Sequence, residues 1–402
     1  MPKPRRISPR VLSLLAFVLL AVVTLVWYVQ THRETSKGEF VRNDSGIPVE
    51  TRYARFAQGF RIDTIPGFQI LTINNPWHGH DQRFQWLLQD SASKCPDCEI
   101  PDSLLALPRL RLPLRHIVAL SSTHLAMLAE LHALDRVVGV SRLDLINAKY
   151  LRDPLLARKV PQVGYGPSIQ IEQVLALTPD VVLTFGVGDT KFDDYPVLQA
   201  AHIPALVLSE WMEPHPLGRL EWIRLLGVLL KREPLADSIF ADRATRYDSL
   251  CAIAKQFSER PTVLTGMSQG DTWYLTGGRN YFAQFLRDAG AHYLWDDDTS
   301  RGGIQVNFEQ ALELGGQAEY WINPGIWNQR AATEKLEPRV KLFAAWQAGR
   351  TYQHDKKADQ QGSSDFWELG MVRPDLVLAD LIQVLHPGSL PNYSSTFYHP
   401  LP

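Results

Sequence analysis

The spacing of apolar residues divides the chain into a strand-rich segment followed by two segments in which strands and helices alternate. Residues 53–95 contain short alternating or β-branched stretches such as GFQILTI, which predict small paired strands. From residue 116 a buried strand, HIVAL, precedes an apolar helix, THLAMLAELHAL, and further buried strands follow as far as residue 209. Alternation of this kind predicts a parallel sheet with helices on both faces.

A long helical region separates the two alternating segments. Residues 217–230 predict one helix, and residues 235–257 continue without Gly or Pro. A helix over the second range would be about 35 Å long, which is enough to connect two lobes. Alternation resumes at residues 262–266 and ends with a helix before Pro387. We therefore predict an α/β fold in which two α/β lobes are joined by one long helix, with a small strand-rich N-terminal extension.

The same pattern sets the predicted domain boundaries. A polar segment of mixed charge follows the first apolar stretch and is typical of a linker. The expected units are a signal anchor or signal peptide at 1–30, a linker at 31–52, the N-terminal extension plus first lobe at 53–233, the interlobe helix at 234–258 and the second lobe at 259–402.

Residues 11–29 form an uncharged apolar stretch. A helix of this length rises about 28 Å, close to the hydrocarbon thickness of a bilayer. The preceding segment carries four basic residues, which hold that end in the cytoplasm: Lys3, Arg5, Arg6 and Arg10. We therefore expect the body of the protein on the periplasmic side of the inner membrane, anchored there by residues 11–29.

A cleaved signal peptide is the alternative for this segment. Its cleavage site would be Ser36-Lys37-Gly38, after which the body would be secreted to the periplasm. No cysteine follows the apolar stretch before Cys95, so no lipoprotein signal is expected.

The composition narrows the possible functions. The chain has 402 residues, 45% of them hydrophobic and 21% charged, which suits a globular protein of two lobes. Its net charge of −2 provides no field that would attract nucleic acid. Scattered histidines and carboxylates leave an enzyme as a formal alternative, but the chain contains no G-x-S-x-G, H-E-x-x-H, P-loop or Rossmann glycine pattern. We predict neither catalysis nor a cofactor or metal site.

Three cysteines occur in the chain. Cys95 and Cys98 form a C-x-x-C pair in a polar loop, SKCPDCEI, and in an oxidising compartment this spacing predicts a small disulfide loop. Cys251 falls within the predicted interlobe helix and is expected to be buried.

Several ordered segments resemble one protein family. They include RHIVALSSTHLAMLAELHALDRVVGVS, VGYGPSIQIEQVLALTPDVVLTFG and GDTWYLTGGRNYFAQFLRDAGAHYLWDDDTS, and the resemblance covers residues 53–390. The chain resembles the substrate-binding proteins of ABC transporters that capture ferric siderophores, cobalamin and haem. The resemblance implies a bilobed protein with a ligand groove between the lobes, a stiff hinge helix, and a membrane permease with its ATPase as partners.

In this family the segment after the first strand of the second lobe faces the groove. GDTWYLTGG occupies that place, and its aromatic pair, Trp273 and Tyr274, is expected at the groove wall, where rings can stack on a ligand. The alternative is that Trp273 packs in the core of the lobe.

Other candidate groove residues lie near the ends of predicted strands. Thr123 and His124 stand where a strand leads into a helix, although residues here also serve as helix caps. Tyr165 lies in a glycine-bounded loop, and Trp211 follows the last strand of the first lobe. Arg301 follows an acidic run and would pair either with that run or with an anionic ligand.

The family also docks on its permease through one acidic residue in each lobe. The matching position in the first lobe is Glu172. In the second lobe the matching helix, FLRDAGA, lacks the usual Glu, and Asp288 is the substitute that we predict.

The ligand is the least determined part of the prediction. Aromatic walls favour a bulky, partly planar chelate, and only Arg301 was found near the candidate segments, which favours low charge. The expected order is a ferric siderophore, then a corrinoid, then haem. A membrane-tethered sensor or accessory protein that uses the same fold without transport is the alternative function.

Overall fold

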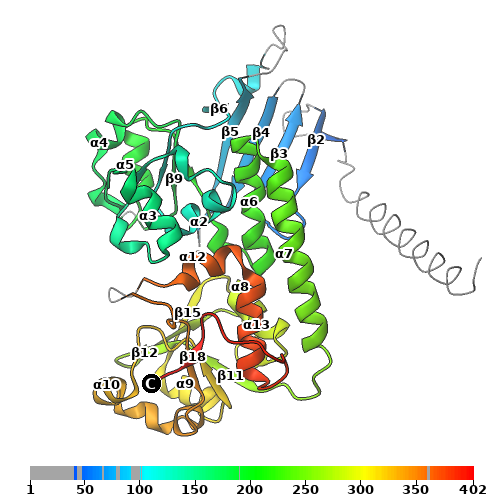
Figure 1. Cartoon of the computed structure of the whole chain (residues 1–402), viewed down its shortest axis with the longest axis vertical. Coiled ribbons are helices and arrows are strands. Elements are labelled where there is room, and N and C mark those ends of the chain that lie inside the picture. The colour runs from blue at the N-terminus through cyan, green and yellow to red at the C-terminus, as the bar shows by residue number, and fades with distance from the viewer. Residues whose placement is uncertain are drawn as a thin grey trace, which may run out of the picture.

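The computed structural model describes residues 40–42, 48–65, 68–77, 82–91, 100, 102–189, 191–359 and 363–402. Two α/β lobes lie one above the other, and long helices run along one side between them (Figure 1). The predicted fold class is therefore confirmed. The apolar stretch 11–29 and the pair Cys95 and Cys98 lie outside the described residues.

The N-terminal extension is a six-stranded sheet beside the first lobe. Its strands follow in chain order, and all neighbours are antiparallel except the last pair. They are β1 (Phe40–Arg42), β2 (Pro48–Tyr53), β3 (Phe60–Ile65), β4 (Phe68–Asn74), β5 (Arg83–Asp90) and β6 (Arg109–Leu112). The predicted linker, 31–52, thus contains β1 and most of β2, because these polar strands pair with the sheet through their backbones.

The first lobe contains a four-stranded parallel sheet of order β10-β9-β7-β8. These strands are β7 (Ile117–Ala119), β8 (Val137–Val140), β9 (Val181–Thr184) and β10 (Ala205–Val207). The connecting helices are α2 (Ser122–Glu130), α3 (Lys149–Ala157), α4 (Ile171–Ala176) and α5 (Tyr195–Ala200). All four strands are apolar because both faces of the sheet are covered.

The second lobe contains a five-stranded sheet of order β14-β11-β16-β17-β18, parallel except for its last strand. Its strands are β11 (Thr262–Thr265), β14 (His292–Tyr293), β16 (Tyr320–Ile322), β17 (Thr351–Gln353) and β18 (His399–Pro400). A second, antiparallel sheet is formed by β12 (Met267–Gln269), β13 (Thr272–Thr276) and β15 (Gly303–Asn307).

The helices of the second lobe are short. They are α8 (Tyr281–Asp288), α9 (Phe308–Gly315), α10 (Arg330–Leu336) and α11 (Ala344–Gln347). Helices α10 and α11 are separate, because Pro338 starts a 3₁₀ segment between them.

A layer of helices lies between the lobes, and it includes the predicted long helix that joins them. It consists of α6 (Pro216–Leu230), α7 (Glu233–Ala254), α12 (Asp365–Val372) and α13 (Pro374–Leu385). Helix α7 is about 33 Å long and reaches from the first lobe to the second (Figure 1). One apolar core runs without interruption from the N-terminal sheet through α6 and α7 into the sheet of the second lobe. Such a core resists large changes in the angle between the lobes.

Two buried carboxylates attach the N-terminal extension to this helical layer. Glu221 of α6 is fully buried and accepts the backbone N–H groups of Arg55, Phe56 and Ala57 at 2.7–3.0 Å, together with a hydrogen bond from Arg224. Each of the two carboxylate oxygens of Glu221 accepts hydrogen bonds, so the buried negative charge is compensated.

Glu213, just before α6, continues the same attachment. It accepts the backbone N–H groups of Gln58 and Gly59 at 2.8 and 2.9 Å and the indole N–H of Trp222 at 2.8 Å. Burial raises the pKa of Glu213, and the hydrogen bonds from Gln58, Trp222 and Gly59 oppose that shift.

The substitution Glu221→Gln tests this attachment. A neutral amide offers one acceptor oxygen instead of two and places an NH₂ group against backbone donors, so we expect the free energy of unfolding to fall by about 2–4 kcal/mol. Urea unfolding followed by tryptophan fluorescence measures the change. Glu313→Gln, on the exposed face of α9, is the matched control and should change it by less than about 0.5 kcal/mol. Equal stabilities of the two variants would contradict the proposed attachment.

Candidate functional site

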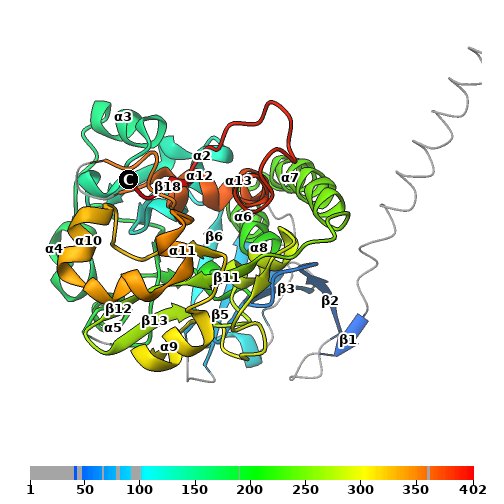
Figure 2. The same cartoon turned by 90° about the horizontal axis from the view of Figure 1, so that it is seen from below.

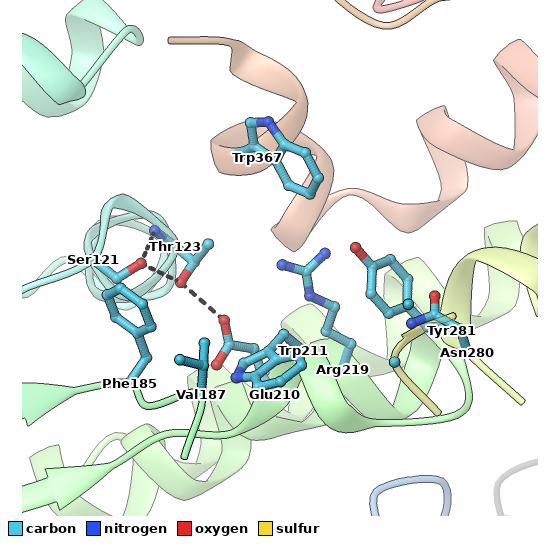
Figure 3. Close-up of a pocket in the computed structure, with 12 residues that line it drawn as sticks. Ser121, Thr123, Phe185, Val187, Glu210, Trp211, Arg219, Asn280, Tyr281 and Trp367 are labelled. Carbon is cyan, nitrogen blue, oxygen red and sulfur yellow. Dashed lines mark hydrogen bonds between the residues drawn. The ribbon is translucent and has the colours of Figure 1, made fainter. Parts of the chain in front are cut away.

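A pocket of about 350 Å³ lies between the two lobes (Figure 3). Its wall combines residues from the first lobe, the helical layer and the second lobe. The lining residues are Ser121, Thr123, Phe185, Val187, Glu210, Trp211, Arg219, Asn280, Tyr281, Gly302, Gly303 and Trp367. Because both lobes contribute, a ligand in this pocket would contact both at once.

The first-lobe residues reach the pocket because they follow the carboxyl ends of parallel strands, where α/β sheets commonly bind ligands. Ser121 and Thr123 come after β7, and Glu210 comes after β10. The Ser121 hydroxyl caps α2 by accepting the Thr123 N–H at 3.3 Å. The Thr123 hydroxyl donates to Oε1 of Glu210 at 2.9 Å (Figure 3), which fixes this carboxylate at the pocket wall.

The loop that carries Phe185 and Val187 rests on a tryptophan of the N-terminal extension. Trp77 is buried, and a Cβ atom added at Gly186 or Gly188 would lie 3.1 or 2.8 Å from its indole ring. These two glycines therefore allow the loop backbone to lie directly against the ring. The extension thus supports one wall of the pocket from behind.

The second-lobe wall depends on close contact between two backbone segments. A Cβ atom at Gly277 or Gly278 would lie 2.5 or 2.3 Å from a carbonyl oxygen of the 298–302 loop. Only glycine allows this approach, and it brings Gly302 and Gly303 to the pocket. Asn280 caps α8 by accepting the Phe282 N–H at 2.7 Å, and its amide also donates to the carbonyl of Arg301.

Arg219, from α6, lies at the base of the pocket. The residue is 7% exposed, and its guanidinium carbon is 4.6 Å from the centre of the Tyr281 ring. This cation–π contact joins the helical layer to the second lobe. The guanidinium points away from its helix into the space below Trp367 (Figure 3).

Helix α12 forms the remaining side of the pocket. It presents Trp367, which is 41% exposed. The next residue, Glu368, is buried and accepts the backbone N–H groups of Asn147 and Ala148 at 2.9 and 2.7 Å. Burial raises the pKa of Glu368 to about 7, and these hydrogen bonds oppose the shift. The contact holds α12 against the start of α3.

Two of the residues predicted for the groove, Thr123 and Trp211, line the pocket. His124 does not, because α2 turns its side chain into the core and leaves it fully buried. This burial lowers the pKa of His124, although the nearby Glu210 opposes the shift. A fully enclosed imidazole is not exposed to a ligand, so the prediction for His124 was wrong.

Trp273 also lies in the core, contrary to its prediction. It is fully buried, donates its indole N–H to the carbonyl of Thr265 at 3.0 Å, and packs against Trp321 and Phe343. Tyr274 follows it on β13 and therefore points to the opposite face of the strand, where it is 39% exposed. Tyr274 is not among the pocket-lining residues.

Tyr165 and Arg301 are exposed but do not line the pocket. Tyr165 precedes a short 3₁₀ helix, Gly166–Ser168, beside the 185–194 loop. Arg301 donates to the side-chain oxygen of Gln58 at 2.7 Å and so joins the second lobe to the N-terminal extension. Neither of the two roles expected for Arg301 includes this contact.

The two acidic docking candidates occupy different environments. Glu172 is exposed on α4. Asp288 is only 19% exposed, and its two carboxylate oxygens accept hydrogen bonds from Tyr247 and Gln284 at 2.7 and 2.9 Å. A carboxylate that is used inside the protein is not available to a permease, so the structure does not support Asp288 as a docking residue.

Sequence reasoning missed several of the lining residues, above all Arg219, Glu210, Phe185, Tyr281 and Trp367. Arg219 lies in an apolar helix, LGRLEWIRLLG, where the usual expectation for an arginine is exposure to solvent. Phe185 could have been found, because it directly follows the carboxyl end of a buried strand, β9. Within the described residues, no group of three or more His, Cys, Asp and Glu could hold a metal ion.

Comparisons with known proteins agree with this architecture. A possible iron-binding periplasmic protein from Staphylococcus epidermidis has a similar structure, with a TM-score of 0.54 and 16% identity over 68% of this chain and 99% of that chain. A periplasmic haem-binding protein from Pseudomonas aeruginosa gives a TM-score of 0.52 and 22% identity over 71% of this chain and 97% of that chain.

A sequence relative is an uncharacterized lipoprotein of Methanocaldococcus jannaschii, which is 21% identical over 72% of this chain and 69% of its own length. The family model described as periplasmic binding protein matches residues 117–358, which include the first lobe, α6, α7 and most of the second lobe. This chain belongs to the periplasmic binding protein family.

Proposed function

We propose that this protein is the extracytoplasmic solute-binding component of an ABC importer, which captures a metal chelate between its lobes and delivers it to a permease. The observation that carries the proposal is a pocket whose wall combines residues of the first lobe, the helical layer and the second lobe. Family membership supports the same role. The uninterrupted core between the lobes favours capture with modest closure.

The shape of the pocket favours a chelate that is only partly enclosed. Its volume of about 350 Å³ is near the lower end for small-molecule sites. Phe185 and Trp367 remain about 40% exposed at the wall, so each has apolar ring surface available for stacking. The volume does not separate the three ligand classes, because a ferric siderophore such as ferrichrome is comparable in size to haem, and the expected order of ligands is unchanged.

The proposed partners are a membrane permease and its ATPase. The exposed Glu172 would dock the first lobe on the permease. None of the helices within the described residues is long and apolar enough to cross a membrane, and residues 11–29 would provide the anchor to the inner membrane. The Methanocaldococcus jannaschii relative is named a lipoprotein. In this chain the apolar segment 11–29, rather than a lipid, would attach the protein to the membrane.

A membrane-tethered sensor or accessory protein is the second candidate. The internal hydrogen bonds of Asp288 favour it, because they leave the second lobe without the expected docking carboxylate. Ligand uptake by cells that lack this protein discriminates between the two roles. Loss of uptake supports the importer, and normal uptake supports the accessory role.

Titration of tryptophan fluorescence tests the binding role. Trp211 and Trp367 line the pocket, so a bound iron, corrin or haem chelate should quench their emission. Ferrichrome and ferric citrate represent ferric siderophores, and cyanocobalamin and haemin represent the other classes. Saturable quenching by a ferric complex, which is recovered unchanged, is expected. Chemical conversion of the bound compound would contradict the proposal.

Two tryptophan substitutions separate the pocket from the core. Trp211→Ala should weaken binding of the quenching ligand by about 1–3 kcal/mol with little change in melting temperature. Trp273→Ala should leave the affinity of the folded protein nearly unchanged and cost about 3–5 kcal/mol of stability, because Trp273 is buried among aromatic rings. Isothermal titration and thermal unfolding measure both effects. If Trp273→Ala instead weakened binding while Trp211→Ala left the affinity unchanged, the ligand would be assigned to the hairpin of β12 and β13.

Sequencing the mature N-terminus tests the anchor. Residues 11–29 are apolar and follow a basic segment, so we expect them to persist in protein isolated from membranes. Mass spectrometry of the N-terminal peptide decides the question, with release by alkaline carbonate as a second measurement. A mature start near Gly38 or Glu39, with the protein in the soluble fraction, would show that the segment is a signal peptide.

A further inference from the structure

Arg219 is a buried cation at the base of the pocket. The residue is 7% exposed, and its Nε has no hydrogen-bond partner within the described part of the chain. Among the residues that the structure describes, no carboxylate lies within 4.0 Å of its guanidinium nitrogens. An arginine removed from water without a partner is strongly unfavourable for folding. Its retention here points to a role in binding.

The geometry of the guanidinium suits a planar anion. The contact with the Tyr281 ring, 4.6 Å from the guanidinium carbon, restricts the plane of the group. The side chain projects into the pocket beneath Trp367 (Figure 3). An arginine held in this way presents parallel N–H donors, which match the two oxygens of a carboxylate.

Glu210 supplies an acceptor in the same pocket. It is 3% exposed, and its Oε1 accepts the hydrogen bond from Thr123. Its Oε2 is buried and accepts no hydrogen bond from any residue that the structure describes. Two buried groups of opposite charge therefore line one cavity, and each has an atom without a hydrogen-bond partner among the described residues. A ligand that brought an anion to Arg219 and an N–H or O–H donor to Glu210 would satisfy both.

We propose that the pocket binds a ligand with a free carboxylate, held by Arg219, and with a neighbouring amide or hydroxyl donor directed at Glu210. This inference rests on the proposed binding function and names the chemistry of the ligand. It also revises the expectation of low ligand charge, which depended on finding few cations in the sequence. Among ferric chelates, the pocket should prefer those that carry carboxylates over neutral ones.

The test compares three arginine variants with four probes. Arg219→Met removes the charge while keeping much of the volume, and Arg219→Lys keeps the charge without the planar fork. Arg246→Met is the matched control, because Arg246 is 58% exposed and pairs only with Asp242 on the surface of α7. Ferric citrate and iron-free citrate carry free carboxylates, whereas ferrichrome and cyanocobalamin do not. Isothermal titration gives each dissociation constant, and thermal unfolding gives the stability of each variant.

We expect wild-type protein to bind ferric citrate more tightly than ferrichrome or cyanocobalamin. Arg219→Met should weaken the binding of ferric citrate by roughly 10- to 100-fold, Arg219→Lys should weaken it less, and Arg246→Met should leave it unchanged. The melting temperature of Arg219→Met should equal or exceed that of wild type, because an unpartnered buried charge has been removed. If Arg219 had a purely structural role, Arg219→Met would instead lower the melting temperature.

The outcomes separate this inference from the binding function itself. Binding of ferrichrome or cyanocobalamin with an affinity that Arg219→Met does not change would overturn the carboxylate assignment and leave the binding function intact. Equal, Arg219-dependent binding of citrate with and without iron would support the assignment but contradict a metal chelate as ligand. A lowered melting temperature of Arg219→Met, combined with an unchanged affinity for ferric citrate, would overturn the assignment by showing that Arg219 only stabilises the fold. If no probe bound to the wild-type protein, both proposals would be wrong.

Discussion

The apolar core that passes through α6 and α7 fixes the spacing between the two lobes, and the rest of the structure depends on it. The core joins the N-terminal sheet, the first lobe, the helical layer and the sheet of the second lobe in one continuous cluster. Because such interiors are densely packed, the lobes cannot rotate far without opening voids. The pocket is therefore largely formed before a ligand arrives, which reduces the conformational cost of binding.

Helix α6 carries two buried charged residues whose surroundings differ. The buried charge of Glu221 is fully compensated by backbone donors and Arg224, and it attaches the N-terminal extension. Arg219, two residues earlier, is also buried, but it faces the cavity with no carboxylate close enough to pair among the described residues. Burial alone therefore does not show whether a charged side chain stabilises the fold or is available to a ligand. What differs between the two residues is whether the protein supplies hydrogen-bonding or ionic partners for the charge.

The sequence predicted the fold well because strand and helix alternation is a local property. It predicted the pocket poorly, because side-chain direction and partners are tertiary properties. Trp273 and Tyr274 were assigned to one wall, although consecutive residues of a strand point to opposite faces. The glycines beside them allow backbone contact with the 298–302 loop rather than an exposed turn. Arg219 could not be identified, since nothing in an apolar helix indicates that one arginine faces a cavity.

The central claim is that one ligand contacts both lobes in the pocket between them. Hydrogen–deuterium exchange, measured with and without the compound that quenches tryptophan fluorescence, tests this claim most directly. If one ligand contacts both lobes, exchange should become slower in the first-lobe segments 121–125 and 185–188 together with the second-lobe segment 302–304. These segments are far apart in the sequence, and residues from each of them line the same cavity. Slower exchange confined to one lobe, or at a surface away from the pocket, would contradict the account.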